Sequence, residues 1–249
     1  KILINSIRDL RSSIYLKSNK NRQRVILIFD SHFLSFGQGE AANALLKLLE
    51  EPPQNTLFIL VTDHINLLLN TINSRCQIIS FPKLNDRFIE KWLSLNTELE
   101  TNVNFFLGLS NGNIHIAKKL ILHEKNEIIR LINNIIKTLI SKNSSLWRSF
   151  NQTYSKILKE DKDLFYLHLT ILKIWFQSTY RLTKNIRHPL HKTELKIGME
   201  RFISNFKNVD YYKIIYDIED LEKSISLNLF LTLSLTNFIL KVQKNLSFK

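Results

Sequence analysis

Short apolar runs alternate with helical patterns in the first third of the chain. Residues 24–29 read RVILIF and residues 56–61 read TLFILV, and both runs are rich in β-branched or aromatic side chains. Runs of this length and composition are typical of strands covered on both faces in a parallel sheet. A third apolar run, QIISF at residues 77–81, predicts a third strand.

Amphipathic helices are predicted around these strands. The segment EAANALLKLLEE repeats apolar side chains with helical spacing at Ala41, Leu45 and Leu48. Pro52 and Pro53 follow and end the helix, because proline disfavours helical geometry before it and lacks the N–H that would continue it. Strands that alternate with helices over about sixty residues predict a layered α/β sheet with right-handed crossovers.

From residue 86 onward the pattern is helical. Three short helices are predicted between residues 86 and 124, and longer helices with wide apolar stripes follow to the end of the chain. Wide stripes are typical of a helical bundle that also packs against something else. We therefore predict an α/β module at 1–83, a small helical domain at 84–124 and a larger helical domain at 125–249.

Charge adds a candidate partner. The formal net charge is +13, which suits a polyanion such as nucleic acid. Lys, Asn and Ile are all abundant, however, and an AT-biased coding sequence produces that composition without selection for binding, so both explanations stay open. Hydrophobic residues make up 44% and charged residues 23% of the chain, the ordinary balance of a folded soluble protein rather than a disordered one.

The ends of the chain and its cysteine content narrow the setting. Cys76 is the single cysteine, which excludes an internal disulfide and a cysteine-based zinc site within these residues and fits a reducing compartment. The most apolar run, from Ile225, is interrupted by polar residues and predicts a buried helix rather than a membrane span. Because the chain opens at Lys1 already in a helical pattern, we expect it to be the later part of a longer protein.

The most specific feature is the stretch AANALLKLLEEPPQNTLFILVTDHINLLLNTINSRCQ at residues 41–77. It resembles the AAA+ clamp-loader ATPases of bacterial DNA polymerase III, in which an AANALLK.LEEPP..T.FIL.T block precedes LL.TI.SRC. The resemblance is close over residues 7–83 and extends to the remainder only in helical layout. It implies a fold class of α/β followed by all-α. The α/β part is a partial AAA+ P-loop-type module at 1–83, and the all-α part consists of a helical lid at 84–124 and a helical collar at 125–249.

The resemblance also assigns a role to Arg75. In SRC this arginine, flanked by Ser74 and Cys76, matches the family's arginine finger, which reaches the γ-phosphate of ATP bound by a neighbouring subunit. A planar guanidinium suits the charge spread over phosphoryl oxygens. The alternative for an isolated arginine is a surface salt bridge. Cys76 has no acid–base partner in the sequence, so we predict a small buried residue and not a nucleophile.

The chain itself lacks the features of a working P-loop ATPase. No GxxxxGK[ST] motif occurs in it. Asp30 matches the family's first acid at a strand end, but Ser31 stands where the catalytic glutamate is expected, and Ile116 stands near the position of the sensor arginine. Thr62 occupies the sensor-1 position, where we predict a strand-end hydrogen bond. Asp30 and Thr62 are therefore degenerate positions of a nucleotide site.

The spacing of the histidines in the sequence does not predict a metal site. The seven are scattered, and His188 and His191 are three residues apart without a further ligand nearby, so solvated histidines are the default expectation. Asp63 and His64 suggest an acid–base pair. We set that pair aside because adjacent residues at a strand end point in different directions.

Together these features imply a non-hydrolysing, delta-prime-like clamp-loader subunit within the DNA polymerase holoenzyme, a nucleotidyltransferase complex. Expected partners are the gamma/tau and delta subunits, the sliding clamp and the backbone of primer–template DNA, in the cytoplasm and without a membrane. ATP and Mg²⁺ belong to the neighbouring subunit, and zinc only to a four-cysteine module ahead of residue 1. The alternative is an ATP-hydrolysing gamma/tau-like subunit whose Walker A motif lies upstream.

Overall fold

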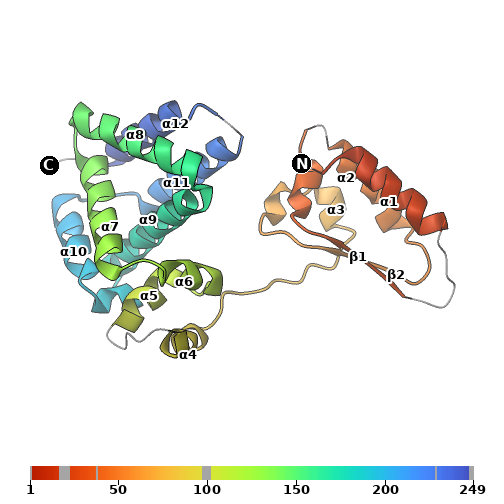
Figure 1. The fold of residues 1–249 in the computed structure, drawn as a ribbon, viewed down its shortest axis with the longest axis horizontal. Helices are drawn as coiled ribbons and strands as arrows, with labels where there is room; N and C mark the ends of the chain where they lie inside the picture. Colours follow the sequence, from red (N-terminus) through yellow and green to blue (C-terminus); the bar gives the residue numbers. More distant parts are fainter. Residues whose placement is uncertain (1, 17–22, 38, 97–101, 228, 247–249) are drawn as a thin grey trace. The chain divides into compact units, whose positions relative to one another are not determined.

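The computed structural model consists of two compact units, residues 1–81 and residues 82–249 (Figure 1). It describes residues 2–16, 23–37, 39–96, 102–227 and 229–246. The described part is mostly helical and carries one sheet, a parallel pair of strands in the first unit. The α/β module followed by helices is therefore confirmed at this coarse level.

The first unit is built around strands β1 and β2. They pair in parallel, with Arg24 opposite Thr56 and Ile28 opposite Leu60. The helix predicted between them forms α2, which ends one residue before Glu51 and two before Pro52. In chain order the elements of this unit are α1 (Ile4–Leu16), β1 (Arg24–Ile28), the 3₁₀ turn η1 (Ser31–Ser35), α2 (Glu40–Glu50), β2 (Thr56–Leu60), the 3₁₀ turn η2 (Ile65–Leu67) and α3 (Asn70–Asn73).

The predicted third strand does not form. Residues 77–81 lie outside any strand and are exposed, and Phe81 is 91% exposed. A β-branched, apolar segment becomes a strand only when a neighbour supplies the other half of the hydrogen-bond ladder. No described strand pairs with this segment, so the sequence preference is not realised.

Only one face of the sheet is covered. Figure 1 shows α1 and α2 on the same side of the strands, where Ile28 is buried and Phe58 packs against the core of this unit. Side chains of the opposite face stay open, with Leu27 54% and Leu57 47% exposed. The prediction of burial on both faces is wrong for the described residues, because no described helix of this unit packs on the second face.

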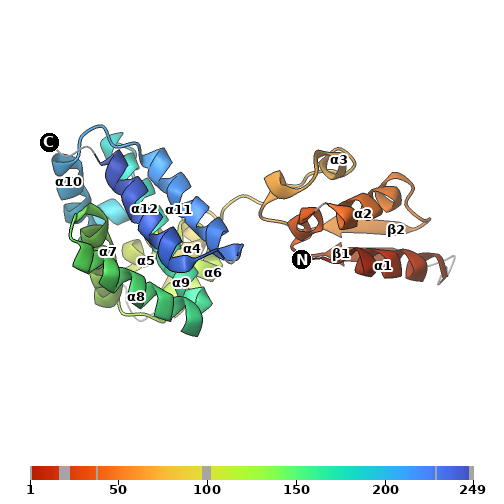
Figure 2. The same cartoon turned by 90° about the horizontal axis from the view of Figure 1, so that it is seen from above.

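The second unit is a helical assembly. The three short helices predicted before residue 124 and the longer helices after it are all present, and α11 and α12 lie side by side (Figures 1 and 2). Its elements are α4 (Asp86–Asn96), α5 (Val103–Ser110), α6 (Ile114–Leu120), α7 (Lys125–Ile140), α8 (Ser144–Glu160), α9 (Lys162–Thr183), the 3₁₀ turn η4 (Pro189–Lys192), α10 (Leu195–Asn205), α11 (Tyr211–Ser226) and α12 (Leu231–Asn245).

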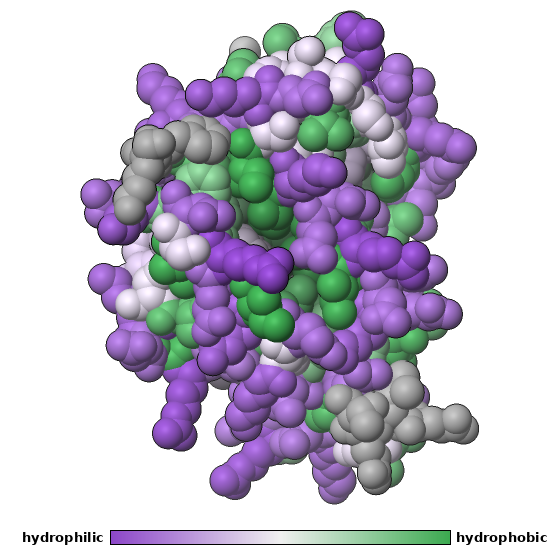
Figure 3. Space-filling view, turned by 90° about the vertical axis from the view of Figure 1, so that its left-hand side faces the viewer, coloured by the Kyte–Doolittle hydropathy of each residue, from purple (hydrophilic) through white to green (hydrophobic). Residues whose placement is uncertain are grey.

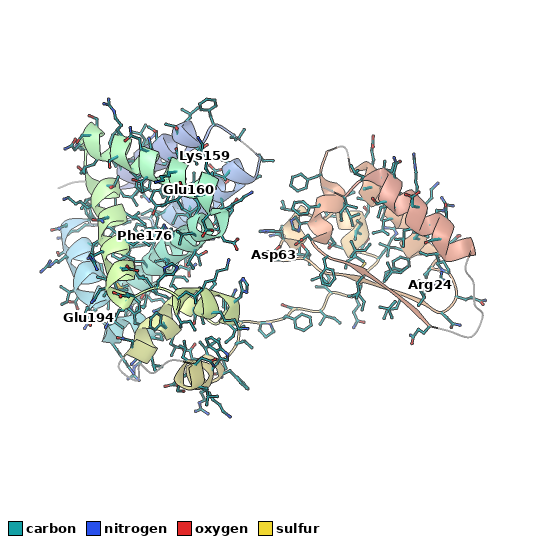
Figure 4. The ribbon with its side chains drawn as sticks, in the orientation of Figure 1. Arg24, Asp63, Lys159, Glu160, Phe176 and Glu194 are labelled. Atoms are coloured by element: carbon teal, nitrogen blue, oxygen red, sulfur yellow. The ribbon has the colours of Figure 1, made fainter. Side chains whose placement is uncertain are left out.

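One hydrophobic core runs through this second unit. Ile89 and Leu93 of α4 belong to the same buried cluster as Phe176 of α9, which is fully buried at the centre of the unit (Figure 4), and Phe238 of α12. We expected a lid and a collar divided near residue 124, and in the structure their helices share this core. The outer face seen in Figure 3 is mostly hydrophilic, with smaller apolar groups between the polar side chains.

The most apolar stretch of the sequence is part of that core. It forms the end of α11 and most of α12, and Leu235, Ile239 and Val242 are buried, as predicted for a buried helix. Among the helices of the described residues, none has both the length and the apolar character to cross a membrane.

Two helical glycines provide a test of the packing of the second unit. A Cβ at Gly108 of α5 would lie 2.6 Å from Cγ of the buried Leu190 and 3.0 Å from its backbone N, whereas a Cβ at Gly198 of α10 would meet no atom within 4 Å. Gly198→Ala should raise the free energy of unfolding by about 0.5–1 kcal/mol through helix propensity. Gly108→Ala should lower it by roughly 1–2 kcal/mol, because overpacking outweighs the same propensity gain.

Both changes can be measured by urea unfolding followed by tryptophan fluorescence. All three tryptophans of the chain, Trp92, Trp147 and Trp175, belong to the second unit, so the signal reports on that unit. Equal stability of the two variants would contradict the packing at Gly108.

His188 makes the stability of the second unit dependent on pH. It is buried, its Nδ1 lies 3.0 Å from the Ser178 hydroxyl, and the Leu190 backbone N–H donates to the same nitrogen at 3.4 Å. Burial of the ring lowers the pKa of His188 from 6.5 to about 4. The default expectation of a solvated histidine is therefore wrong here.

Because this pKa is lower in the folded than in the unfolded chain, unfolding takes up protons below pH 6.5 and stability is lost as the pH falls toward 4. We expect His188 to make the second unit roughly 2 kcal/mol less stable at pH 5 than at pH 7. His188→Asn, which keeps an acceptor for the Leu190 N–H, should reduce that difference by the same amount in urea titrations. An unchanged pH dependence would contradict this account.

Candidate arginine-finger site and strand-end loops

Arg75 lies in the turn that follows the short helix α3. Ile72 of α3 is buried in the core of the first unit, and the Arg75 backbone N–H donates to the Ile72 carbonyl at 3.0 Å. The helix is thus fixed through its apolar side chain, and the turn brings the next polar residues to the surface.

The Arg75 guanidinium is bonded within its own unit, and the side chain is partly open to solvent. Its Nη2 forms an ion pair with Glu50 Oε1 at 2.5 Å, and its Nη1 donates to the Thr71 carbonyl at 2.9 Å and to the Ser74 hydroxyl at 3.4 Å. The side chain is 35% exposed. The surface salt bridge considered from the sequence is therefore present, and it holds the guanidinium at the end of α2.

Such an ion pair can be exchanged. Pairs between partly exposed side chains stabilise a protein by only about 0–1 kcal/mol, whereas a phosphate accepts charge-assisted, bidentate hydrogen bonds from the same guanidinium. Glu50 can therefore orient Arg75 without holding it irreversibly. Whether the arginine acts on a nucleotide stays a prediction.

Ser74 and Cys76 flank the arginine in different ways. The Ser74 hydroxyl donates to the Thr71 carbonyl at 3.1 Å and supports the turn. Cys76 is half-buried against the core of the first unit, and this burial raises the pKa of its thiol. A raised pKa disfavours the nucleophilic thiolate. The sequence predicted a buried Cys76, and the structure places it at intermediate burial.

The loop after β1 brings its residues back toward β2. Asp30 adopts a left-handed backbone conformation (φ 48°) and starts η1, and the Phe33 N–H donates to its carbonyl at 2.9 Å. Ser31 is fully buried, and its backbone N–H and hydroxyl both donate to the Val61 carbonyl, at 2.9 and 3.1 Å. Asp30 is exposed. Asp30 therefore faces solvent, whereas Ser31 is bonded inside the unit.

Thr62 joins the loops that follow the two strands. Its hydroxyl lies 3.0 Å from His32 Nδ1 and accepts the His64 backbone N–H at 3.0 Å. The predicted strand-end hydrogen bonding is thus observed. Figure 4 labels Asp63 at this end of the unit and Arg24 at the opposite end of the strands, so these contacts lie where the parallel strands finish, the edge at which such sheets gather ligands.

His32, Asp63 and His64 come together at the same edge. The carboxylate Oδ1 of Asp63 lies 3.5 Å from His64 Nε2 and 3.9 Å from His32 Nδ1. We set the Asp63–His64 pair aside because neighbours in a strand point apart, but β2 ends at Leu60 and both residues lie beyond it. His32 is only 6% exposed, so it is not a solvated histidine either.

The position near the expected sensor arginine is apolar in three dimensions. Ile116 lies in α6, is half-buried and packs against the core of the second unit. Asn113 caps this helix by accepting the backbone N–H groups of His115 and Ile116. Ile116 therefore serves packing, and its side chain offers no donor to a phosphate.

Basic side chains line a groove of the second unit that lies between α8 and α12 and measures about 730 Å³. Arg148, Lys156 and Lys159 supply positive charge, none of the described residues that line it is acidic, and Asn151 Oδ1 is buried there without a hydrogen-bond partner. Sequence reasoning did not single out these residues, because they become neighbours only through the pairing of two distant helices.

Comparison with known proteins finds similarity to DNA polymerase III subunits. A sequence profile described as "DNA polymerase III, delta subunit" matches residues 1–85. The gamma subunit of DNA polymerase III from Buchnera aphidicola (subsp. Schizaphis graminum) is 29% identical over 219 residues, which cover 82% of this chain and 58% of the relative. The delta-prime subunit from Haemophilus influenzae is 34% identical over 97 residues, 39% of this chain and 29% of the relative.

The chain is thus similar to subunits of DNA polymerase III, most specifically over residues 1–85. The relatives that it matches are named as gamma, tau and delta-prime subunits. The tau subunit from Bacillus subtilis, for example, is 38% identical over 86 residues, 34% of this chain and 15% of that relative. The chain spans about half or less of the length of the curated relatives it matches. A gamma subunit-related protein from Thermotoga maritima aligns with 98% of this chain and 80% of its own at 21% identity and a TM-score of 0.41, a distant likeness on which no assignment rests.

The packing of Cys76 in the first unit is open to a direct chemical test. Because burial raises the pKa of its thiol, we expect iodoacetamide to alkylate the native chain several-fold more slowly at pH 8 than the same chain in 6 M guanidinium chloride, where the thiol titrates normally. Mass spectrometry follows the reaction without ambiguity, since the chain has a single cysteine. Equal rates in both solvents would show that Cys76 is not protected.

Proposed function

We propose that this chain is a delta-prime-like subunit of the DNA polymerase III clamp loader, which scaffolds the ring and supplies Arg75 to ATP bound by a neighbouring subunit. The observation that carries the proposal is the state of the Arg75 side chain. It is fixed by the Thr71 carbonyl and Glu50 at its own surface and partly open to solvent. A side chain in this state is suited to a pocket in another chain.

The ion pair with Glu50 gives the proposed finger a resting position. When a neighbour brings a γ-phosphate to Arg75, the phosphate oxygens take over hydrogen bonds that the Glu50 carboxylate accepts in the isolated chain. Glu50 prevents the side chain from sampling many rotamers, which reduces the entropy cost of forming the joint site. The neighbour supplies ATP and Mg²⁺.

The strand-end residues favour a subunit that does not hydrolyse ATP itself. The hydroxyl of Ser31 is directed to a backbone carbonyl and is fully buried, so this position offers no carboxylate to activate water. Thr62 is committed to His32 and to the loop of His64. With Ile116 packed in the second unit, none of these positions supplies the group that ATP hydrolysis requires.

The second unit would serve as lid and collar. Its wide apolar core and long helices suit subunit packing in a ring with gamma/tau and delta subunits, and the sliding clamp and primer–template DNA are the proposed targets. The groove of Arg148, Lys156 and Lys159 is the candidate contact with a phosphate backbone, which such cations would bind without reading sequence. A cytoplasmic location belongs to the same proposal.

An ATP-hydrolysing, gamma/tau-like subunit is the second candidate. It is favoured by the longer match, since similarity to the Buchnera gamma subunit extends over 219 residues while that to the Haemophilus delta-prime subunit covers 97. ATP turnover by the full-length protein alone, without partner subunits, separates the two. Brisk turnover would support the second candidate and refute the first.

Reconstitution of the complex with partner ATPase subunits tests the assignment of Arg75 as an arginine finger. In Arg75→Ala, DNA-stimulated ATP hydrolysis at the adjacent site should fall by about 10³–10⁵-fold, so the assembled complex loses the contribution of one site. Arg75→Lys should restore little of it, because a lysine cannot reproduce the planar bidentate contact. The variant should still assemble into the complex, which size-exclusion chromatography can verify.

Arg11→Ala is the matched control. Arg11 is an exposed arginine on α1 of the same unit, so its replacement removes an equal charge. It should leave the turnover of the complex unchanged. Normal turnover in Arg75→Ala, or an equal loss in Arg11→Ala, would remove the finger assignment.

A further inference from the structure

We infer that His32, Asp63 and His64 form a binding site for a divalent first-row transition metal ion, with Zn²⁺ as the reference ion. The sequence led us to expect no metal in this chain. Two imidazoles and one carboxylate, supplied by the loops after β1 and β2, are the only such group of three among the described residues. The inference concerns the first unit alone and does not rest on the proposed role of Arg75.

The spacing of the donor atoms suits one ion. Asp63 Oδ1 lies 3.5 Å from His64 Nε2 and 3.9 Å from His32 Nδ1, and one ligand atom from each of the three residues lies within 4.8 Å of the others. In a tetrahedral Zn²⁺ site with bonds of about 2.0–2.1 Å, two donors lie roughly 3.4 Å apart, so the 3.5 Å separation fits and the 3.9 Å separation is about half an ångström too long. Small side-chain rotations close that difference.

The site combines one fixed ligand with two accessible ones. His32 is buried, and its ring contacts those of Phe33 and His64 at centroid distances of 4.3 and 5.0 Å. The side chains of Asp63 and His64 are 78% and 58% exposed. A metal ion can therefore enter from solvent, and its remaining coordination positions are open to water.

The ligand types select the class of ion. Neutral imidazole suits Zn²⁺, Cu²⁺, Ni²⁺ and Fe²⁺, whereas Mg²⁺ and Ca²⁺ prefer sites made of oxygen ligands. A set of two histidines and one carboxylate with open positions is thus a transition-metal site and not a residual magnesium site of a nucleotide pocket.

A simple ion pair explains less of this arrangement. Pairing with Asp63 accounts for the orientation of the exposed His64, but the buried His32 directs Nδ1 toward the same carboxylate oxygen, Oδ1. His32 Nδ1 also lies 3.0 Å from the Thr62 hydroxyl. The metal would take over this nitrogen, while Thr62 keeps its hydrogen bond from the His64 backbone and holds the second loop in place.

A bound ion would cross-link the two strand-end loops. Because the metal binds the folded loops and not an extended chain, it would stabilise the first unit by RT ln(1 + c/Kd), where c is the free metal concentration.

Titration of the tag-free full chain tests the site. We expect Zn²⁺ to bind with a stoichiometry of one in isothermal titration calorimetry, and Co²⁺ to give d–d absorption bands of a low-coordinate site that Zn²⁺ abolishes. His64→Ala and Asp63→Asn should each weaken binding about tenfold or more. Both residues are exposed in a loop, so these variants should fold, as far-UV circular dichroism can verify.

His115→Ala is the matched control, because His115 is an exposed histidine of the second unit, and it should bind as the wild type does. Failure of the wild-type chain to bind Zn²⁺ below millimolar concentration would overturn the inference. Unchanged binding in His64→Ala and Asp63→Asn, or an equal loss in His115→Ala, would do the same, since the ion would then lie elsewhere.

Discussion

The contact between Arg75 and Glu50 connects the packing of the first unit to its exposed chemistry. α2 is held in the core by Leu45 and Leu48, and its last residue, Glu50, meets the guanidinium at 2.5 Å. On the other side, Ile72 anchors α3 in the same core and places the turn that carries Arg75. The buried side chains of α2 and α3 therefore together define the position of the Arg75 guanidinium. Loss of either helix would leave the arginine without a defined position.

The edge of the sheet at the ends of β1 and β2 has a different organisation. In a working P-loop ATPase this edge carries acidic and polar groups for nucleotide and Mg²⁺. Here Ser31 is turned inward, Thr62 ties the loops together, and His32, Asp63 and His64 converge on one point. The partly exposed Arg75, the proposed finger, thus lies apart from a strand-end edge whose side chains bond with the chain's own loops.

The sequence predicted those parts of the fold that depend on local pattern. β1, α2, β2 and the helices after residue 86 follow from apolar spacing, and the stop of α2 follows from Pro52 and Pro53. The prediction of a strand at 77–81 was wrong because a strand needs a paired neighbour, which a residue pattern does not reveal.

The cluster of His32, Asp63 and His64 was missed because the left-handed Asp30 turns the loop back and brings His32 to Thr62. The repeated Asp and His after each strand, in FDSH and VTDH, was the available signal.

The central claim, that Arg75 completes a nucleotide site in another subunit, is tested most directly by trapping the transition-state geometry. ADP with aluminium fluoride mimics the transferred phosphoryl group, whose charge an arginine finger stabilises. The number of ADP molecules retained per assembled complex should be lower by one when the complex contains Arg75→Ala in place of the wild-type chain. Equal retention in the two complexes would contradict the account.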